Sequence, residues 1–167
     1  MVCYSVALWV KVCKCGVKIM FSGVNHLNLD PKNRLAIPAR YRDALLVDSG
    51  QVVISLDSAQ CLQIYPLQEW EIVRTKIQNL PNSIHPVVKS YQRLVLGHAE
   101  QIELDKAGRV LLPATLKQMV GLERELVLVG MGNRFELWDK NKWQAETEKA
   151  LQASAEDLAL LLNGLSV

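Results

Sequence analysis

The sequence has few of the residues and runs that define several protein classes. Only four cysteines, three histidines and 6% aromatic residues occur among 167. The uncharged stretch over residues 1–10 is far shorter than the roughly 20 apolar residues of a membrane span. Half of the chain is hydrophobic and 22% is charged, which excludes a disordered, collagen-like or low-complexity chain. The composition predicts one globular unit, or two very small ones, with no membrane partner.

The cysteines do not form a disulfide framework. Cys3, Cys13 and Cys15 lie within the first 19 residues, and Cys61 stands alone in an apolar run. The first three could ligate a metal together, but no histidine or further cysteine pair follows at zinc-finger spacing. We therefore expect free thiols in a reducing cytoplasm, with no metal and no cofactor.

The net charge of +2 conceals an uneven distribution. Residues 1–19 hold three lysines and no acid, so the rest of the chain has 16 basic residues against 17 acidic ones, a net charge of −1. Within that acidic remainder, residues 30–42 carry +3 and residues 105–117 carry +2. Basic charge is thus concentrated in two short segments.

Residues 1–19 do not follow the order of a secretory signal, because the uncharged stretch precedes the lysines. A new patterned segment begins at Met20. We expect residues 1–19 to be a dispensable extension, or the product of a start codon placed too far upstream.

The chain contains an internal repeat. LDPKNRLAIPARYR (29–42) aligns with LDKAGRVLLPATLK (104–117) at an offset of 75, with five identical positions. VVISLDSAQCLQIYPLQEW (52–70) aligns with ELVLVGMGNRFELWDKNKW (125–143) at an offset of 73 and places Trp70 over Trp143. A two-residue difference in one loop accounts for the change of offset.

Each copy predicts a strand, a tight turn, a short strand, a short helix that begins at proline, a hairpin and a longer helix. One copy alone buries too little surface to be stable, so we expect the two to share one core as a pseudo-symmetric unit. Trp70 and Trp143 are expected to pack in it. The expected ranges are 23–29, 35–37, 52–56, 60–65 and 66–79 in the first copy, 99–104, 110–112, 125–129, 134–138 and 139–162 in the second, and a connecting helix over 86–96, with Pro38 and Pro113 at the first positions of the short helices.

The repeated Asp-x-x-x-Arg turn has a structural and a functional interpretation. In the structural one, Asp30 and Asp105 accept backbone hydrogen bonds and pair with Arg34 and Arg109, which only stabilises the turns. An exposed ion pair contributes little stability, so its recurrence at equivalent places favours a further role.

In the functional interpretation the turns contact DNA. Arg34 and Arg109 can each donate two hydrogen bonds to guanine, and a two-stranded ribbon fits the major groove. Lys32 and Lys106 would contact phosphates, which provides affinity without reading sequence.

Arg40 and Arg42 follow Pro38 on the expected short helix. They either extend the basic surface as auxiliary DNA contacts or simply face solvent. The second copy has Thr115 and Lys117 there, so we expect the first copy to be the stronger DNA contact.

No catalytic constellation is evident. The chain lacks a phosphate loop, a dinucleotide fingerprint and a nucleophile elbow. His26, His85 and His98 are scattered without a nucleophile, and the acidic pair Glu100 and Glu103 has no second cluster beside it. We predict no catalytic residue and no small-molecule substrate.

The last helix has an apolar stripe for which we expect a role between subunits, formed by Ala150, Leu151, Ser154, Ala155, Leu158, Leu161 and Leu162.

From Met20 onward the sequence resembles the MraZ family of bacterial transcriptional regulators, through MFSGVNHLNLDPKNRLAIPARYR, LDKAGRVLLPATLK and the paired tryptophan segments. The resemblance implies a DNA-binding protein at the head of the division and cell-wall gene cluster. It would recognise short G-rich direct repeats in its own promoter and assemble into rings at the nucleoid. The DNA-binding roles would fall on Lys32, Arg34, Lys106 and Arg109, with Asp30 and Asp105 completing the motif.

The family fold is α+β but mainly β: a tandem swapped-hairpin, SpoVT-AbrB-like β-barrel with a pseudo-two-fold repeat and peripheral helices. One departure is Asn33, which stands where the second copy has Gly108; both tolerate a positive φ.

The alternative function is a protein-interaction module of the same fold, an antitoxin-like adaptor with no DNA target of its own. The expected division is an extension over 1–19, half-domains over 20–80 and 98–143, a connecting helix over 81–97 and a C-terminal helix over 144–167.

Overall fold

The computed structural model describes residues 20–46, 50–81 and 86–152. Cys3, Cys13, Cys15 and His85, and the part of the leucine stripe after residue 152, lie outside these residues. In chain order the elements are β1 (Phe21–Asn28), β2 (Arg34–Ala36), α1 (Ala39–Leu46), β3 (Gln51–Leu56), β4 (Leu62–Pro66), α2 (Leu67–Gln78), α3 (Pro86–Gly97), β5 (Glu100–Glu103), β6 (Arg109–Leu111), α4 (Ala114–Met119), β7 (Glu125–Gly132), β8 (Phe135–Asp139) and α5 (Lys140–Gln152).

The two copies exchange their first strands. β1 of the first copy pairs antiparallel with β7 of the second over all eight of its residues. In the same way, β5 of the second copy pairs antiparallel with β3 of the first. Each hairpin, β3–β4 or β7–β8, is therefore completed by a strand from the other copy. The predicted interleaved, swapped-hairpin arrangement is confirmed.

The barrel, however, is not closed. The main sheet has the strand order β1-β7-β8-β4-β3-β5, so among the described strands β1 and β5 form its edges. The hairpins meet only where Leu62–Ile64 of β4 pair with residues 135–137 of β8. β2 and β6 do not join this sheet; they pair with each other in a separate two-stranded ribbon.

The short helices α1 and α4 begin at Ala39 and Ala114, one residue later than predicted. Pro113 has a ψ of 128°, which is extended rather than helical. The carbonyls of Pro38 and Pro113 accept the first helical hydrogen bonds, from Tyr41 at 2.9 Å and Lys117 at 3.0 Å. The prolines are therefore at the N-cap position, where the carbonyl is already used but the backbone is not helical.

A shared aromatic centre joins the copies. Phe21 of β1, Tyr41 of α1 and Phe135 of β8 have ring centroids between 4.1 and 5.8 Å apart. The Tyr41 hydroxyl also donates to the backbone carbonyl of Ser22 at 2.6 Å. Because these residues come from both copies and are all buried, neither copy retains this core without the other.

Two smaller clusters repeat on the outside of the sheet. Tyr65 and Trp70 pack with centroids 5.6 Å apart, and the equivalent Trp138 and Trp143 pack at 5.9 Å. Trp70 is buried and Trp143 is half-buried against its cluster. Both tryptophans pack against hydrophobic clusters, but these clusters are separate from the core that the two copies share, and Trp143 is only partly buried.

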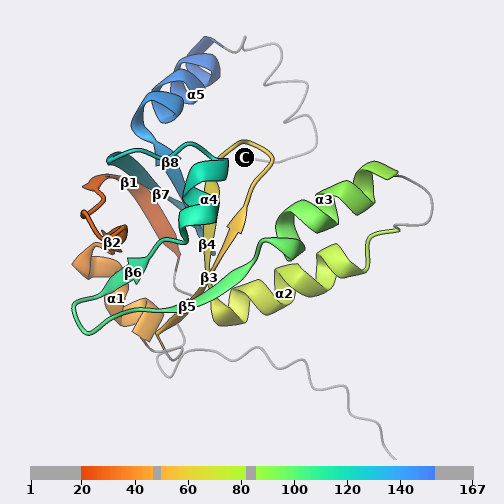
Figure 1. Cartoon of the computed structure of the whole chain (residues 1–167), viewed down its shortest axis with the longest axis horizontal. Coiled ribbons are helices and arrows are strands. Elements are labelled where there is room, and N and C mark those ends of the chain that lie inside the picture. The colour runs from red at the N-terminus through yellow and green to blue at the C-terminus, as the bar shows by residue number, and fades with distance from the viewer. Residues whose placement is uncertain (1–19, 47–49, 82–85, 153–167) are drawn as a thin grey trace, which may run out of the picture.

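Figure 1 shows α2 and α3 lying side by side on one side of the sheet, while the β2–β6 ribbon lies on the opposite side of the molecule. Gln92 of α3 donates to the backbone carbonyl of Ile77 in α2 at 2.8 Å, which ties the two helices together. None of the helices in the described ranges is both long and apolar enough to cross a membrane.

Candidate nucleic-acid interface

The first turn is organised by the carboxylate of Asp30. One oxygen, Oδ1, accepts from the backbone N–H groups of Lys32 and Arg34, both at 2.8 Å. The other, Oδ2, accepts from Nε of Arg34 at 2.7 Å. The N–H of Asn33 closes the turn on the Asp30 carbonyl at 3.0 Å, and Asn33 has a φ of 59°. This is the pattern of a three-residue loop that ends in a left-handed residue.

The second turn repeats this geometry. Oδ1 of Asp105 accepts from the N–H groups of Ala107 at 2.9 Å and Arg109 at 3.0 Å. Oδ2 accepts from Nε of Arg109 at 2.8 Å and lies 2.7 Å from its Nη2. Gly108 occupies the left-handed position, with a φ of 72°. Each aspartate therefore holds both its loop and its arginine.

These contacts lower the pKa of both carboxyl groups below the ordinary value of 3.8. For Asp30 the largest cause is the hydrogen bond from the backbone N–H of Arg34, and for Asp105 it is the hydrogen bond from the Arg109 side chain. Asp105 in turn raises the pKa of Arg109, with a smaller contribution from the charge of Asp30. Both turns thus carry ionised carboxylate–guanidinium pairs at neutral pH.

The β2–β6 ribbon brings the two arginines onto one face. Arg34 lies opposite Leu111, and Arg109 lies opposite Ala36. The central pair of the ribbon is fully buried and points to the core, so these four residues share the outward face. Diagonal neighbours in such a ribbon lie about 7–8 Å apart, and their Cβ atoms are somewhat closer. The side chains of Arg34 and Arg109 remain 31% and 34% exposed, which leaves their outer edges accessible.

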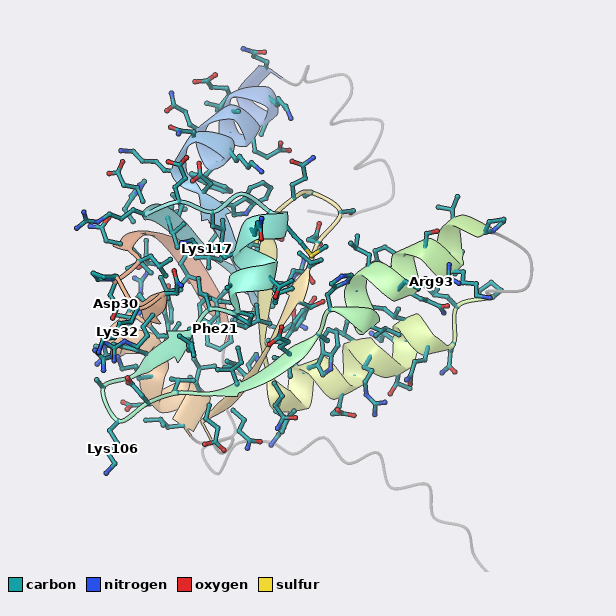
Figure 2. The ribbon with its side chains drawn as sticks, viewed as in Figure 1. Phe21, Asp30, Lys32, Arg93, Lys106 and Lys117 are labelled. Atoms are coloured by element: carbon teal, nitrogen blue, oxygen red, sulfur yellow. The ribbon has the colours of Figure 1, made fainter. Side chains whose placement is uncertain are left out.

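The two turn lysines extend outward from this ribbon. Lys32 and Lys106 are both exposed. Figure 2 shows Lys106 projecting away from the body at the tip of the second turn, and Lys32 beside Asp30 in the first. The structure thus brings together all six predicted motif residues, four basic and two acidic.

Arg40 and Arg42, the possible auxiliary DNA contacts on α1, point to different parts of the molecule. Arg40 donates through Nη2 to the side chain of Asn25 in β1 at 2.8 Å, and its guanidinium lies 4.6 Å from the ring centroid of Tyr41. Arg42 donates through Nε to the carbonyl of Ile37 at 2.7 Å and packs across Gly108 of the second turn. The ribbon therefore places Arg42 against the second turn, while Arg40 is directed toward β1. Their role as auxiliary DNA contacts stays a prediction.

One cation beside the first turn was not among the predicted site residues. The ammonium of Lys117, on α4, donates to the Asn33 side chain at 3.0 Å. Figure 2 shows Lys117 at the side of α4 that faces Asp30 and Lys32. The signal was present in the sequence, because the offset of 75 aligns Lys117 with Arg42 and Gly108 with Asn33.

Comparison with known proteins agrees with the repeat. The family model described as "MraZ protein, putative antitoxin-like" matches twice, at residues 20–87 and 95–162. The chain belongs to the MraZ family.

Relatives of this MraZ family member match over most of their length. The protein named Transcriptional regulator MraZ from Thiobacillus denitrificans is 46% identical over 149 residues, covering 89% of this chain and all of that one. Its namesake from Chromobacterium violaceum is 49% identical over 141 residues, covering 84% and 95%. That from Shewanella denitrificans is 50% identical over 131 residues, covering 77% and 86%. Each family-model match includes one complete Asp-x-x-x-Arg turn.

Among the residues that the structure describes, the other titratable side chains do not form a metal site. Glu103 accepts from the Gln51 side chain at 3.0 Å, and a ring nitrogen of His98 lies 3.1 Å from the Leu94 carbonyl. Across the part of the chain that the structure describes, no three His, Cys, Asp or Glu side chains gather as they would around a metal ion.

Proposed function

We propose that this MraZ family member is a sequence-specific DNA-binding transcriptional regulator that contacts duplex DNA with its β2–β6 ribbon. The observation that carries the proposal is the placement of Arg34 and Arg109 on one exposed ribbon face, each held by its own aspartate. A ribbon of two strands fits the roughly 12 Å width of the major groove. The name that the relatives carry supports the regulatory role.

The arginines are suited to reading guanine. Nε of Arg34 is occupied by Asp30, which leaves its terminal nitrogens to donate to O6 and N7 of a base. Arg109 also directs Nη2 toward Asp105, but its guanidinium retains N–H groups on the outer edge. Since a guanidinium fixed before binding loses less rotamer entropy, we assign Asp30 and Asp105 the role of orienting the arginines.

The lysines are suited to phosphates. Lys32 and Lys106 are exposed at the loop tips, where an ammonium reaches the DNA backbone without reading bases. Four cations in the two turns are few for a DNA-binding protein with an acidic body. Several subunits bound to successive sites would compensate through avidity, which supports a ring-shaped homo-oligomer.

The resemblance to MraZ proteins supplies the finer part of the proposal. The DNA target would be G-rich direct repeats in the protein's own promoter, at the head of the division and cell-wall gene cluster, and the protein would act at the nucleoid in the cytoplasm. We also propose the division into half-domains 20–80 and 98–143, with 81–97 as connector and 144–167 as the C-terminal helix.

A mobility-shift titration of the full chain on its own upstream DNA tests the proposal. Arg34→Ala combined with Arg109→Ala should abolish binding. Arg74→Ala combined with Arg93→Ala removes the same charge from α2, where the Arg74 side chain is 41% exposed, and from the exposed Arg93 of α3, and should bind as the parent protein does. Equal binding by both double variants would refute the assignment of the site.

The alternative function is an antitoxin-like protein-interaction module, a role that the wording of the family description favours. Copurification separates the two functions. A stoichiometric protein partner, together with no affinity for the upstream DNA, would favour the adaptor over the regulator.

A further inference from the structure

Each turn is contacted by a basic side chain from the other copy of the repeat. Lys117, on α4 of the second copy, donates to Asn33 at the tip of the first turn at 3.0 Å. A surface depression beside that turn is lined by both residues, by Arg124 and by two acids, Asp30 and Glu123. The ammonium of Lys117 is therefore within the first turn's surface although its backbone belongs to the second copy.

Arg42 occupies the equivalent place at the second turn. Its Nε donates to the carbonyl of Ile37, while the N–H of Ile37 donates to the carbonyl of Gly108 at 3.0 Å. The stem of Arg42 lies so close over Gly108 that a side-chain carbon there would clash with its Cδ. The half-buried Arg42 thus has its position fixed through Nε and its stem. Within the described ranges its terminal nitrogens form no hydrogen bond, which leaves them available to a ligand.

The two contacts are related by the internal repeat. The offset of 75 that aligns Arg34 with Arg109 also aligns Arg42 with Lys117. The backbone repeats the relation, since the N–H of Leu112 donates to the carbonyl of Asn33 at 2.9 Å, as Ile37 does to Gly108. An arrangement produced twice by one pseudo-two-fold relation is a property of the fold rather than of one flexible side chain.

Arg40 lies two residues from Arg42 yet is directed elsewhere. It is engaged by Asn25 and by the ring of Tyr41, toward β1. Arg40 therefore serves as an internal control, with the same charge on the same helix but no contact with either turn.

We propose that each DNA half-site is bound by a composite of both copies: the first turn together with Lys117, and the second turn together with Arg42. In each composite the turn arginine reads a base, and the cation from the other copy contacts a phosphate that flanks that base. This inference rests on the proposed function. It assigns Arg42 to the half-site of Arg109 and Lys117 to the half-site of Arg34.

Salt-dependent DNA affinity tests the phosphate contacts. Each lost phosphate contact lowers the slope of log affinity against log salt by about 0.9. The binding deficit of Lys117→Gln relative to the parent should therefore shrink three- to fourfold, as a rough figure, between about 50 and about 200 mM salt. Arg42→Gln should behave likewise, whereas Arg40→Gln should keep the parent slope.

Two further variants separate a phosphate contact from a purely structural clamp. Asn33→Gly keeps the positive φ of the turn but removes the hydrogen-bond partner of Lys117. Asn33→Gly should keep the parent slope of log affinity against log salt. If Asn33→Gly and Lys117→Gln lose the same affinity and neither changes that slope, the phosphate contact of Lys117 is refuted. Arg42→Lys keeps the charge and should keep the slope, so an equal loss with Arg42→Lys and Arg42→Gln, both at unchanged slope, would also refute it.

Phosphate-ethylation interference locates each contact. The half-sites are first assigned by the bases at which Arg34→Ala and Arg109→Ala lose discrimination. In Lys117→Gln, ethylation of the phosphates that flank the bases assigned to Arg34 should no longer weaken binding. In Arg42→Gln, the same should hold for the phosphates that flank the bases assigned to Arg109. The opposite assignment would overturn the composite model but leave the proposed function intact. If the parent protein fails to bind, or if the double arginine variant binds as well as the parent, the proposed function itself fails and the composite model with it.

Discussion

Arg34 and Arg109 lie diagonally across the β2–β6 ribbon, one beside each turn and both on its outward face. They are 75 residues apart in sequence, yet the antiparallel register makes them neighbours. Because each guanidinium is also fixed by a carboxylate four residues before it, the ribbon presents two oriented arginines as one surface.

Replacing Arg34 by lysine should separate charge from base reading. A lysine keeps the positive charge but cannot donate the paired hydrogen bonds of a guanidinium to guanine. Arg34→Lys should therefore keep the parent salt slope and lose about 1–3 kcal/mol of discrimination against substituted bases. Competition titrations with single-base variants of the upstream DNA measure this. Retained discrimination would mean that Arg34 does not read a base.

The pKa of Asp105 should depend on its arginine side chain more strongly than the pKa of Asp30 does. Both carboxyl groups should titrate below 3.8 by carbon-detected NMR. Arg109→Ala should return the pKa of Asp105 toward that value, because the hydrogen bond from the Arg109 side chain is the largest cause of the lowered pKa. Arg34→Ala should change Asp30 less, because the backbone N–H of residue 34 remains.

The sign of the stability effect follows from these lowered values. A carboxylate whose pKa is lower in the folded state stabilises it at pH values above the unfolded pKa. The contribution of both turns should thus be complete at neutral pH and should disappear as the pH falls below 3.8 through the folded values. Denaturation of the Asp30→Asn and Asp105→Asn variants at several pH values measures this. Their deficit in unfolding free energy relative to the parent protein should shrink as the pH falls, and a deficit that grows on acidification would contradict the prediction.

Gly108→Ala should destabilise the protein by about 1–2 kcal/mol or more, since alanine is strained in the left-handed region. Its methyl group would also displace Arg42 from the turn. Gly97→Ala is the matched control, because a methyl group there meets open space and φ is not positive. Urea denaturation of both variants checks the difference. Equal midpoints would contradict the close packing of Arg42 on the turn.

Phe135→Ala should destabilise both copies together, by about 3–5 kcal/mol, because its ring packs on Phe21 and Tyr41 of the other copy. With Trp9 replaced by phenylalanine, tryptophan fluorescence of Trp70→Phe reports on the second copy through Trp138 and Trp143, and that of the Trp138→Phe, Trp143→Phe double variant reports on the first copy through Trp70. Their urea midpoints should coincide with each other and with circular dichroism. Two separate transitions would mean that the copies unfold independently.

Most elements were predictable to within a few residues from local pattern. The helix predicted over 66–79 is Leu67–Gln78, and the one predicted over 86–96 is Pro86–Gly97. The larger differences have tertiary or turn causes. β7 extends to Gly132 rather than 129 because β1 pairs along its full length. β4 begins at Leu62 rather than 60 because Gln60 has a φ of 62° and closes a turn on Asp57.

The sequence by itself determined the repeat and the internal geometry of each turn, because an aspartate and an arginine four residues apart interact locally whatever surrounds them. Tertiary structure alone decided which turn each helix cation contacts, that β2 and β6 pair in a ribbon apart from the main sheet, and that Arg34 and Arg109 share a face. Those outcomes depend on pairing between residues about 75 positions apart. Such pairing is set by the register of exchanged strands around a common core, which local patterns do not specify.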